Sequence, residues 1–230
     1  MVLKIVKTVW PVMLTYVAIG APCGMIMAQT GMEPWMVFAL SSTFVTGSGQ
    51  FMVCNLWLAG VPAASIVASV AAISSRFALY SASIAPHLAG ASKRQTLAVA
   101  ATLTEEAYGI SLAKLIEGQD WGPRESFALN VILIATWGVS CTMGAVVGAV
   151  VDVPTALAGF VCTSLFICLL FSQRLSRGNI IAAALAAVSV AICKFLGWTN
   201  VAVPVSVLVG VAAALACDAL VEGRGARDAR

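Results

Sequence analysis

Residues 126–151 read SFALNVILIATWGVSCTMGAVVGAVV and contain no Asp, Glu, Lys or Arg. A helix needs about 20 consecutive apolar residues to cross the hydrocarbon layer of a bilayer. Backbone N–H and C=O groups find no water in that layer, so a helix, in which these groups bond to one another, is the favoured spanning structure. This stretch therefore predicts a transmembrane helix.

The composition of the whole chain agrees with that prediction. Its 230 residues are 60% hydrophobic and 10% charged, and the mean hydropathy is +0.97. A soluble domain carries about 25% charged residues, because its surface must be hydrated. A soluble protein is therefore excluded. The net charge of +3 comes without a basic block, so no nucleic-acid partner is expected.

Further apolar stretches predict an all-α, polytopic membrane helix bundle of about eight spans in a single domain, residues 1–230. Turn residues such as Gly31, Pro34, Gly60, Pro62 and Gly118 separate the stretches. The expected spans are 8–31, 34–59, 62–88, 95–117, 126–151, 154–173, 179–197 and 200–221.

The orientation follows from the loops, because cytoplasmic loops carry an excess of Lys and Arg. A cytoplasmic N-terminus puts nine of these residues inside, namely Lys4, Lys7, Lys114, Arg124, Arg174, Arg177, Arg224, Arg227 and Arg230. Three fall outside, namely Lys93, Arg94 and Lys194. We therefore expect both termini in the cytoplasm. Lys93 and Arg94 fit this poorly, and a re-entrant segment near them would change the count.

Two expected spans contain residues that disfavour a helix. Pro22 should kink the first, and Thr46-Gly47-Ser48-Gly49-Gln50-Phe51 has poor helix propensity in the middle of the second. Transporters use such broken helices to bind ligands, although glycine and serine also permit close helix packing. A shift of 120 residues suggests a weak repeat of 8–118 in 126–222.

Charged residues near the middle of apolar spans are the strongest functional signal. Arg76 lies in the third expected span, and Glu105 and Glu106 lie in the fourth. Such groups face protein or a water-filled cavity, because each costs about 2.5–3.5 kcal/mol at the centre of a membrane. Arg76, Tyr80, Ser83 and His87 share one helical face, whereas Glu105 and Glu106 point about 100° apart.

This cluster has two interpretations, which can coexist. It can be a buried ion pair that fixes helix register, or it can be a site for a substrate or a proton. A zwitterionic substrate suits it, with Arg76 or the Gly47–Gln50 amides for a carboxylate and a glutamate for an ammonium group.

No enzymatic, cofactor or metal site is expected. The single histidine and the absence of a C-x-x-C pair leave no zinc ligand set. The cysteines fall inside apolar runs and are expected to pack as small hydrophobic side chains, namely Cys23, Cys54, Cys141, Cys162, Cys168, Cys193 and Cys217.

Three ordered motifs resemble those of AzlC-type proteins, the large subunits of branched-chain amino acid exporters. Gly47-Ser48-Gly49-Gln50-Phe51 is similar to their G-A-S-Q-F element. Ser75 to Ser83, SRFALYSAS, resembles R-H-x-L-Y-G-x-S, and Leu103 to Tyr108, LTEEAY, resembles L-T-D-E-x-F. The resemblance extends from about Tyr16 to Ala219.

The resemblance implies a bacterial inner-membrane exporter of leucine, isoleucine, valine or methionine, with a small AzlD-type partner subunit. It assigns substrate binding to Gly47, Ser48, Gly49, Gln50, Arg76 and Tyr80, and proton coupling to Glu105 and Glu106. Phe77 and Ser74 depart from the family pattern, which has histidine and Asn or Asp there, and Glu105 replaces an aspartate. The alternatives are a structural or regulatory membrane subunit, and a membrane-embedded enzyme that uses Glu105 or Glu106.

Overall fold

The apolar sequence forms helices throughout the computed structural model, which describes residues 1–88, 90–118, 121–150 and 177–198 and a few single residues between 160 and 213. Every regular element among the described residues is a helix, which confirms the all-α prediction. The chain divides into a first unit, residues 1–58 and 74–163, and a second unit, residues 59–73 and 164–230. The expected spans 154–173 and 200–221 lie largely outside the described residues.

Three helical segments among the described residues are long and apolar enough to cross a membrane. They are α1 (Val2–Gln29), the segment Ala63–Leu88 and α8 (Pro123–Val150). The middle segment comprises α4 (Ala63–Ser74), α5 (Arg76–Ile84) and the 3-10 helix η1 (Ala85–Leu88). Pro22 lies inside α1, which remains one helix. The expected total of about eight spans is not confirmed.

Helices α1 and α8 run parallel and touch backbone to backbone. A Cβ atom on Gly24 would lie 1.7 Å from the carbonyl oxygen of Cys141, and one on Gly144 would lie 2.0 Å from that of Ala21. Glycine is required at both positions because any side chain would overlap the opposite backbone, and such close packing is typical of helix pairs in membranes. Helices α1 and α8 are therefore held together in one packing arrangement.

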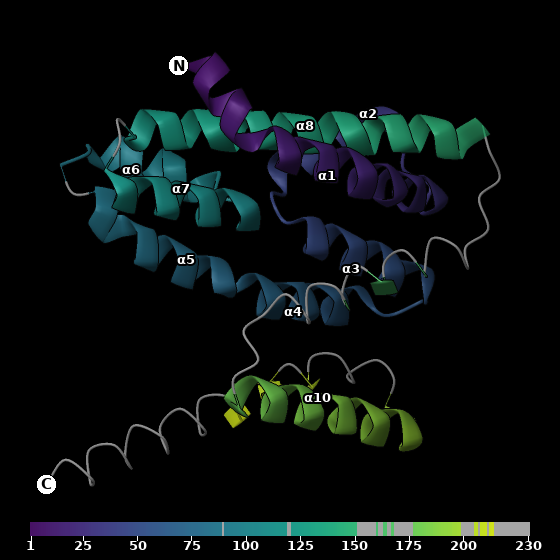
Figure 1. The fold of residues 1–230 in the computed structure, drawn as a ribbon. Helices are drawn as coiled ribbons and strands as arrows, with labels where there is room; N and C mark the ends of the chain where they lie inside the picture. The colour runs from purple at the N-terminus through teal and green to yellow at the C-terminus, as the bar shows by residue number, and fades with distance from the viewer. Residues whose placement is uncertain are drawn as a thin grey trace, which may run out of the picture. The chain divides into compact units, whose positions relative to one another are not determined.

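The expected single span 34–59 is instead two short helices that form a hairpin. Helix α2 (Pro34–Thr43) and helix α3 (Gly47–Leu58) are separated by residues 44–46. Helix α2 runs antiparallel to α8, because it starts soon after α1 ends near Gly148 and reaches Gly138 at its own far end, where Ser42 lies. Figure 1 shows α3 turning back toward the end of the unit where α1 finishes.

The prediction of one continuous span over 95–117 is wrong. Helix α6 (Lys93–Ala101) ends before Thr102, and helix α7 (Glu105–Glu117) begins after Thr104. Helix α6 runs parallel to α8, because Gln95 and Arg124 line one cavity and the Asn130 side chain donates to the Val99 carbonyl oxygen. Helices α6 and α7 form a second hairpin. This hairpin and the first one begin at opposite ends of the unit.

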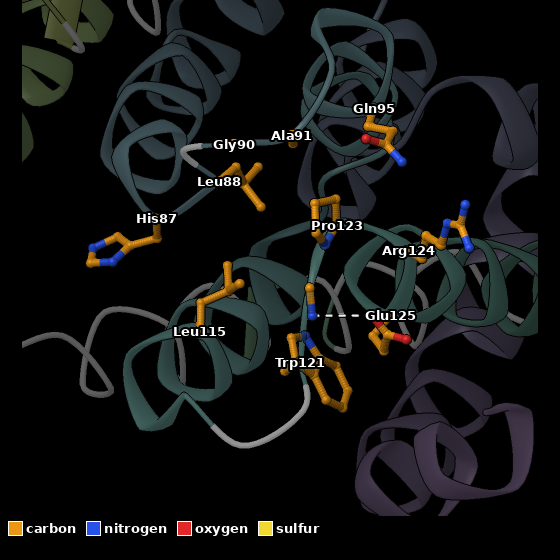
Figure 2. Close-up of a pocket in the computed structure, with 11 residues that line it drawn as sticks. His87, Leu88, Gly90, Ala91, Gln95, Leu115, Trp121, Pro123, Arg124 and Glu125 are labelled. Atoms are coloured by element: carbon orange, nitrogen blue, oxygen red, sulfur yellow. Dashed lines mark hydrogen bonds between the residues drawn. The ribbon is translucent and has the colours of Figure 1, made fainter.

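Helix α7 returns to the end where α6 began. Its first residue pairs with Arg76 at the start of α5, and Leu115 packs near Leu88 at the end of η1, which directly follows α5. Helices α5 and α7 are therefore parallel, and the loops before α6 and after α7 lie at one end. Figure 2 shows the cavity that they share with the start of α8.

This arrangement corrects the predicted loop assignment. Lys93 and Arg94 lie at the same end of the first unit as Arg124, and not at the opposite end. Helix α1 begins at that end too, because it is parallel to α8. In the described part of the first unit, all Lys and Arg residues except Arg76 gather there, namely Lys4, Lys7, Lys93, Arg94, Lys114 and Arg124. We call it the basic end.

The second unit contains α10 (Arg177–Phe195), which matches the expected span 179–197. Its apolar part, Ile180–Phe195, is shorter than a full span. Most of α4 also belongs to this unit.

Candidate functional site

The tips of the two hairpins meet beside the middle of α8. The α6–α7 tip is held at Asn130, whose Nδ2 donates to Thr102 Oγ1 at 3.0 Å. The α2–α3 tip lies at Trp137, where the indole would contact a Cβ on Gly47 at 3.0 Å. Seven residues of helix separate these levels, or about 10 Å. The two tips therefore face each other near the centre of α8.

A threonine caps the second helix of each hairpin. Thr46 Oγ1 accepts from the Gly49 amide at 3.1 Å, and Thr104 Oγ1 accepts from the Ala107 amide at 3.2 Å. Threonine is a favoured N-cap because its oxygen satisfies one of the first amides of a helix, which have no intrahelical partner. The starts of α3 and α7 carry a partial positive charge, as the first turn of any helix does. Both helix starts point toward the place where the tips meet.

Arg76, Glu105 and Ser48 form a hydrogen-bonded triad at this meeting point. Arg76 Nη2 pairs with Glu105 Oε1 and donates to Ser48 Oγ at 2.6 Å. Ser48 Oγ donates to the same Glu105 oxygen at 3.1 Å. The triad therefore joins α5 to both hairpins. The Arg76 and Glu105 side chains are 27% and 21% exposed, so the pair is not sealed in a dry contact.

Glu106 points away from this triad and is bound by α1. Tyr16 Oη donates to Glu106 Oε2 at 2.6 Å and lies within hydrogen-bond distance of Thr104 Oγ1, at 3.2 Å. Tyr16 is 6% exposed, whereas Glu106 is exposed. The two glutamates therefore have different partners, as the helical geometry predicts. Tyr16 was missed in the sequence because a tyrosine in an apolar helix gives no sign of its partner.

Gln50 is enclosed in the α2–α3 tip. Its Oε1 accepts from Ser41 Oγ at 3.2 Å and from Trp137 Nε1 at 3.0 Å, and its Nε2 donates to the Phe44 carbonyl oxygen at 2.6 Å. The Gln50 side chain is fully buried. Gln50 thus holds the tip against α8, while Ser48, two residues earlier, is a member of the triad.

The polar face of α5 packs along α7. Tyr80 stacks on Tyr108 with ring centroids 4.5 Å apart, and Tyr108 Oη donates to Ser83 Oγ at 3.0 Å. Phe77 lies edge-on to Tyr80 and under the Arg76 guanidinium, 5.6 Å from ring centroid to Cζ. The position where the family pattern has histidine therefore offers an aromatic face to the arginine. Ser74 Oγ is buried without a hydrogen-bond partner among the described residues.

A cavity of about 570 Å³ lies at the basic end of the first unit. Figure 2 shows His87 and Arg124 on different sides of it, with Leu88, Leu115 and Trp121 between them. The carboxylate of Glu125 accepts from the Gly122 amide at 3.0 Å. The cavity combines apolar side chains with the polar side chains of His87, Gln95 and Arg124.

Together, the tips bring a cation, two carboxylates and the first amides of two helices to the middle of apolar segments. Such an arrangement can bind a small zwitterion or exchange protons. Within the described ranges, no group of three or more His, Cys, Asp or Glu residues is placed to hold a metal ion. Cys23, Cys54, Cys141 and Cys193 are buried, as expected for packing residues.

The family model described as AzlC protein matches residues 11–151. The matched region contains both hairpins, α8 and all of α1 after its first nine residues. No curated protein and no solved structure matches the chain.

Proposed function

Because the chain belongs to the AzlC family of membrane transport-related proteins, we propose that it is a secondary transporter that exports small apolar amino acids across a bacterial inner membrane. The triad of Arg76, Glu105 and Ser48 between the hairpin tips carries this proposal. A charged triad in apolar segments is costly, and such groups mark substrate or ion pathways in membranes.

The substrate class follows from the charges at the tips. Arg76 and the first amides of α3, at Gly47 and Ser48, bind the substrate carboxylate, since the start of a helix favours an anion. A glutamate, Glu105 or Glu106, receives the ammonium group. Gly49 and Gln50 stabilise the conformation of the α2–α3 tip, and Tyr80 lengthens the substrate site along α5. The aliphatic side chain of leucine, isoleucine, valine or methionine occupies apolar space.

Proton coupling is assigned to Glu105 and Glu106. Each lies in the first turn of α7, and each has a separate hydrogen-bond partner. A carboxylate that binds a proton in place of an ammonium group would couple export to proton uptake. Substitution of both by glutamine should abolish the dependence of efflux on a pH gradient.

We propose that the basic end and both chain termini lie in the cytoplasm. The six basic residues at that end support it, because positive residues are retained on the cytoplasmic side. A small AzlD-type membrane subunit completes the transporter, as the family resemblance implies.

The proposal is tested by efflux of radiolabelled leucine from vesicles that contain the protein and its small partner. We expect leucine to leave the vesicles, while leucinamide, which lacks the carboxylate, and isocaproate, which lacks the amine, are not exported. Arg76→Lys retains the charge and should still lower export, because it loses the planar fork that binds a carboxylate. Equal export of all three compounds would overturn the proposal.

Two alternatives predict other outcomes. A structural subunit with Arg76 as a brace predicts no leucine export in any condition, but unchanged assembly with other subunits. A membrane enzyme that uses Glu105 or Glu106 predicts turnover of a lipid or a peptide without any gradient. The family match favours transport over both.

A further inference from the structure

The first unit contains the same arrangement twice, in opposite directions. Helix α1 precedes the α2–α3 hairpin, which enters from the end opposite the basic end. Helix α5 precedes the α6–α7 hairpin, which enters from the basic end. Helix α5 runs antiparallel to α1, because α5 ends at the basic end where α1 begins. Inverted repeats of this kind occur in many secondary transporters.

The correspondence extends to single residues at the tips. Thr46 and Thr104 are 58 positions apart, and each accepts from the amide three residues later. The next amide, Gln50 or Tyr108, donates to the carbonyl oxygen of the same threonine, at 3.0 Å and 2.9 Å. The two tips are therefore equivalent in hydrogen bonding, although their sequences, Thr-Gly-Ser-Gly and Thr-Glu-Glu-Ala, differ.

Each tip is also bound by the helix that precedes the hairpin of the other repeat. Arg76 on α5 donates to Ser48, two residues after Thr46. Tyr16 on α1 donates to Glu106, two residues after Thr104. Tyr16 and Arg76 are 60 positions apart, close to the 58 that separate the tips. The Tyr16–Glu106 and Arg76–Ser48 contacts thus occupy equivalent places in the two repeats.

We infer that Tyr16 is a positioning residue for transport, equivalent to Arg76, and that the two contacts close the site toward opposite sides of the membrane. The Tyr16–Glu106 contact holds the hairpin that enters from the basic end, and the Arg76–Ser48 contact holds the other hairpin. Both contacts are present in this structure. Their alternate release exposes the site to one side at a time. This role in transport rests on the proposed function.

The test uses two equivalent reporters, Thr43→Cys at the end of α2 and Ala101→Cys at the end of α6, each exposed and 58 positions apart. All native cysteines are first replaced, and a membrane-impermeant thiol reagent is added from one side at a time. Tyr16→Phe should increase labelling at position 101 from the basic end roughly tenfold, the effect of losing one hydrogen bond to a charged group. Labelling at position 43 should not change.

The reciprocal variant gives the reciprocal result. Ser48→Ala should increase labelling at position 43 from the opposite side and leave position 101 unchanged. Glu106→Gln keeps an oxygen acceptor for Tyr16 but loses the charge, so its labelling at position 101 should increase less than that of Tyr16→Phe. Tyr108→Phe removes a tyrosine hydroxyl that touches neither tip and serves as the matched control.

The inference is overturned if Tyr16→Phe leaves both reporters unchanged or increases both equally. It is also overturned if Glu106→Gln behaves as Tyr16→Phe does. Leucine efflux is measured on the same vesicles. Side-specific labelling without leucine export would refute the proposed substrate while supporting the two contacts, whereas export without side-specific labelling would refute the contacts alone.

Discussion

Gln50 and Trp137 are joined by a hydrogen bond of 3.0 Å from the indole Nε1 to the amide Oε1, although 87 residues separate them in the chain. This bond fixes the α2–α3 tip at the middle of α8. The rest of the Gln50 amide is used within the tip, at Ser41 and Phe44. A polar side chain is therefore what keeps a broken helix in one conformation inside an apolar environment.

Gln50→Leu should strongly destabilise the protein. The substitution leaves the Trp137 N–H and the Phe44 carbonyl oxygen without their partner in a buried place, at a cost of about 1–3 kcal/mol for each group. Thermal unfolding in detergent measures the loss. Thr43→Val is the control, because the Thr43 hydroxyl is exposed and bonds only within its own helix. Equal unfolding temperatures for the two variants would contradict this account of the tip.

Gly144→Ala should prevent α1 and α8 from packing. The added Cβ would lie 2.0 Å from the Ala21 carbonyl oxygen, which belongs to a helix backbone and cannot rotate away. Gly109→Ala is the matched control, since its Cβ would have no atom within 4 Å and its φ is not positive. Alanine is favoured over glycine in a helix by about 1 kcal/mol, so the control should be unchanged or slightly more stable. Yield of folded protein by size-exclusion chromatography distinguishes them.

The sequence was sufficient to predict a membrane protein and the pairing of Arg76 with a glutamate. It was not sufficient to predict the contact of Tyr16 or the path of the chain. Poor helix propensity from Thr46 to Phe51 predicted an interrupted span, but the break lies just before this stretch, at residues 44–46, and Gly47 to Phe51 form the start of α3. The break at Thr102 to Thr104 was missed, because Glu105 and Glu106 were interpreted as charged residues inside one continuous span and not as the first turn of a new helix. The signal that could have shown it is Thr104, a threonine followed by two acids, which is typical of a helix start.

The partners of the two glutamates illustrate the same limit. Helical geometry predicts that Glu105 and Glu106 diverge, and the structure assigns Glu105 to Arg76 and Glu106 to Tyr16. The second assignment depends on how α1 crosses the α6–α7 tip. That crossing is set by glycine contacts between α1 and α8, which no local pattern near Tyr16 encodes.

Arg76→Met should destabilise the protein more than the double variant Arg76→Met with Glu105→Leu. The single variant leaves Glu105 without its cation, and breaking a buried pair costs about 3–5 kcal/mol. The cost here should be near or below the lower limit, because the side chains are 27% and 21% exposed. The double variant should regain stability in thermal unfolding but export no leucine. Normal export by the double variant would leave the pair as a structural brace only.

The re-entrant path of α6 and α7 predicts which residues share a side of the membrane. Arg94 at the start of α6 and Glu117 at the end of α7 lie at the basic end, whereas Glu33, between α1 and α2, lies at the other end. In a background without native cysteines, Arg94→Cys and Glu117→Cys should react with an impermeant thiol reagent added from the cytoplasmic side. Glu33→Cys should react only from the outside. A continuous span from 95 to 117 would place positions 94 and 117 on opposite sides, so labelling of these two from different sides would refute the hairpin. Loss of the hairpin would remove the inverted repeat, and with it the equivalence of Tyr16 and Arg76.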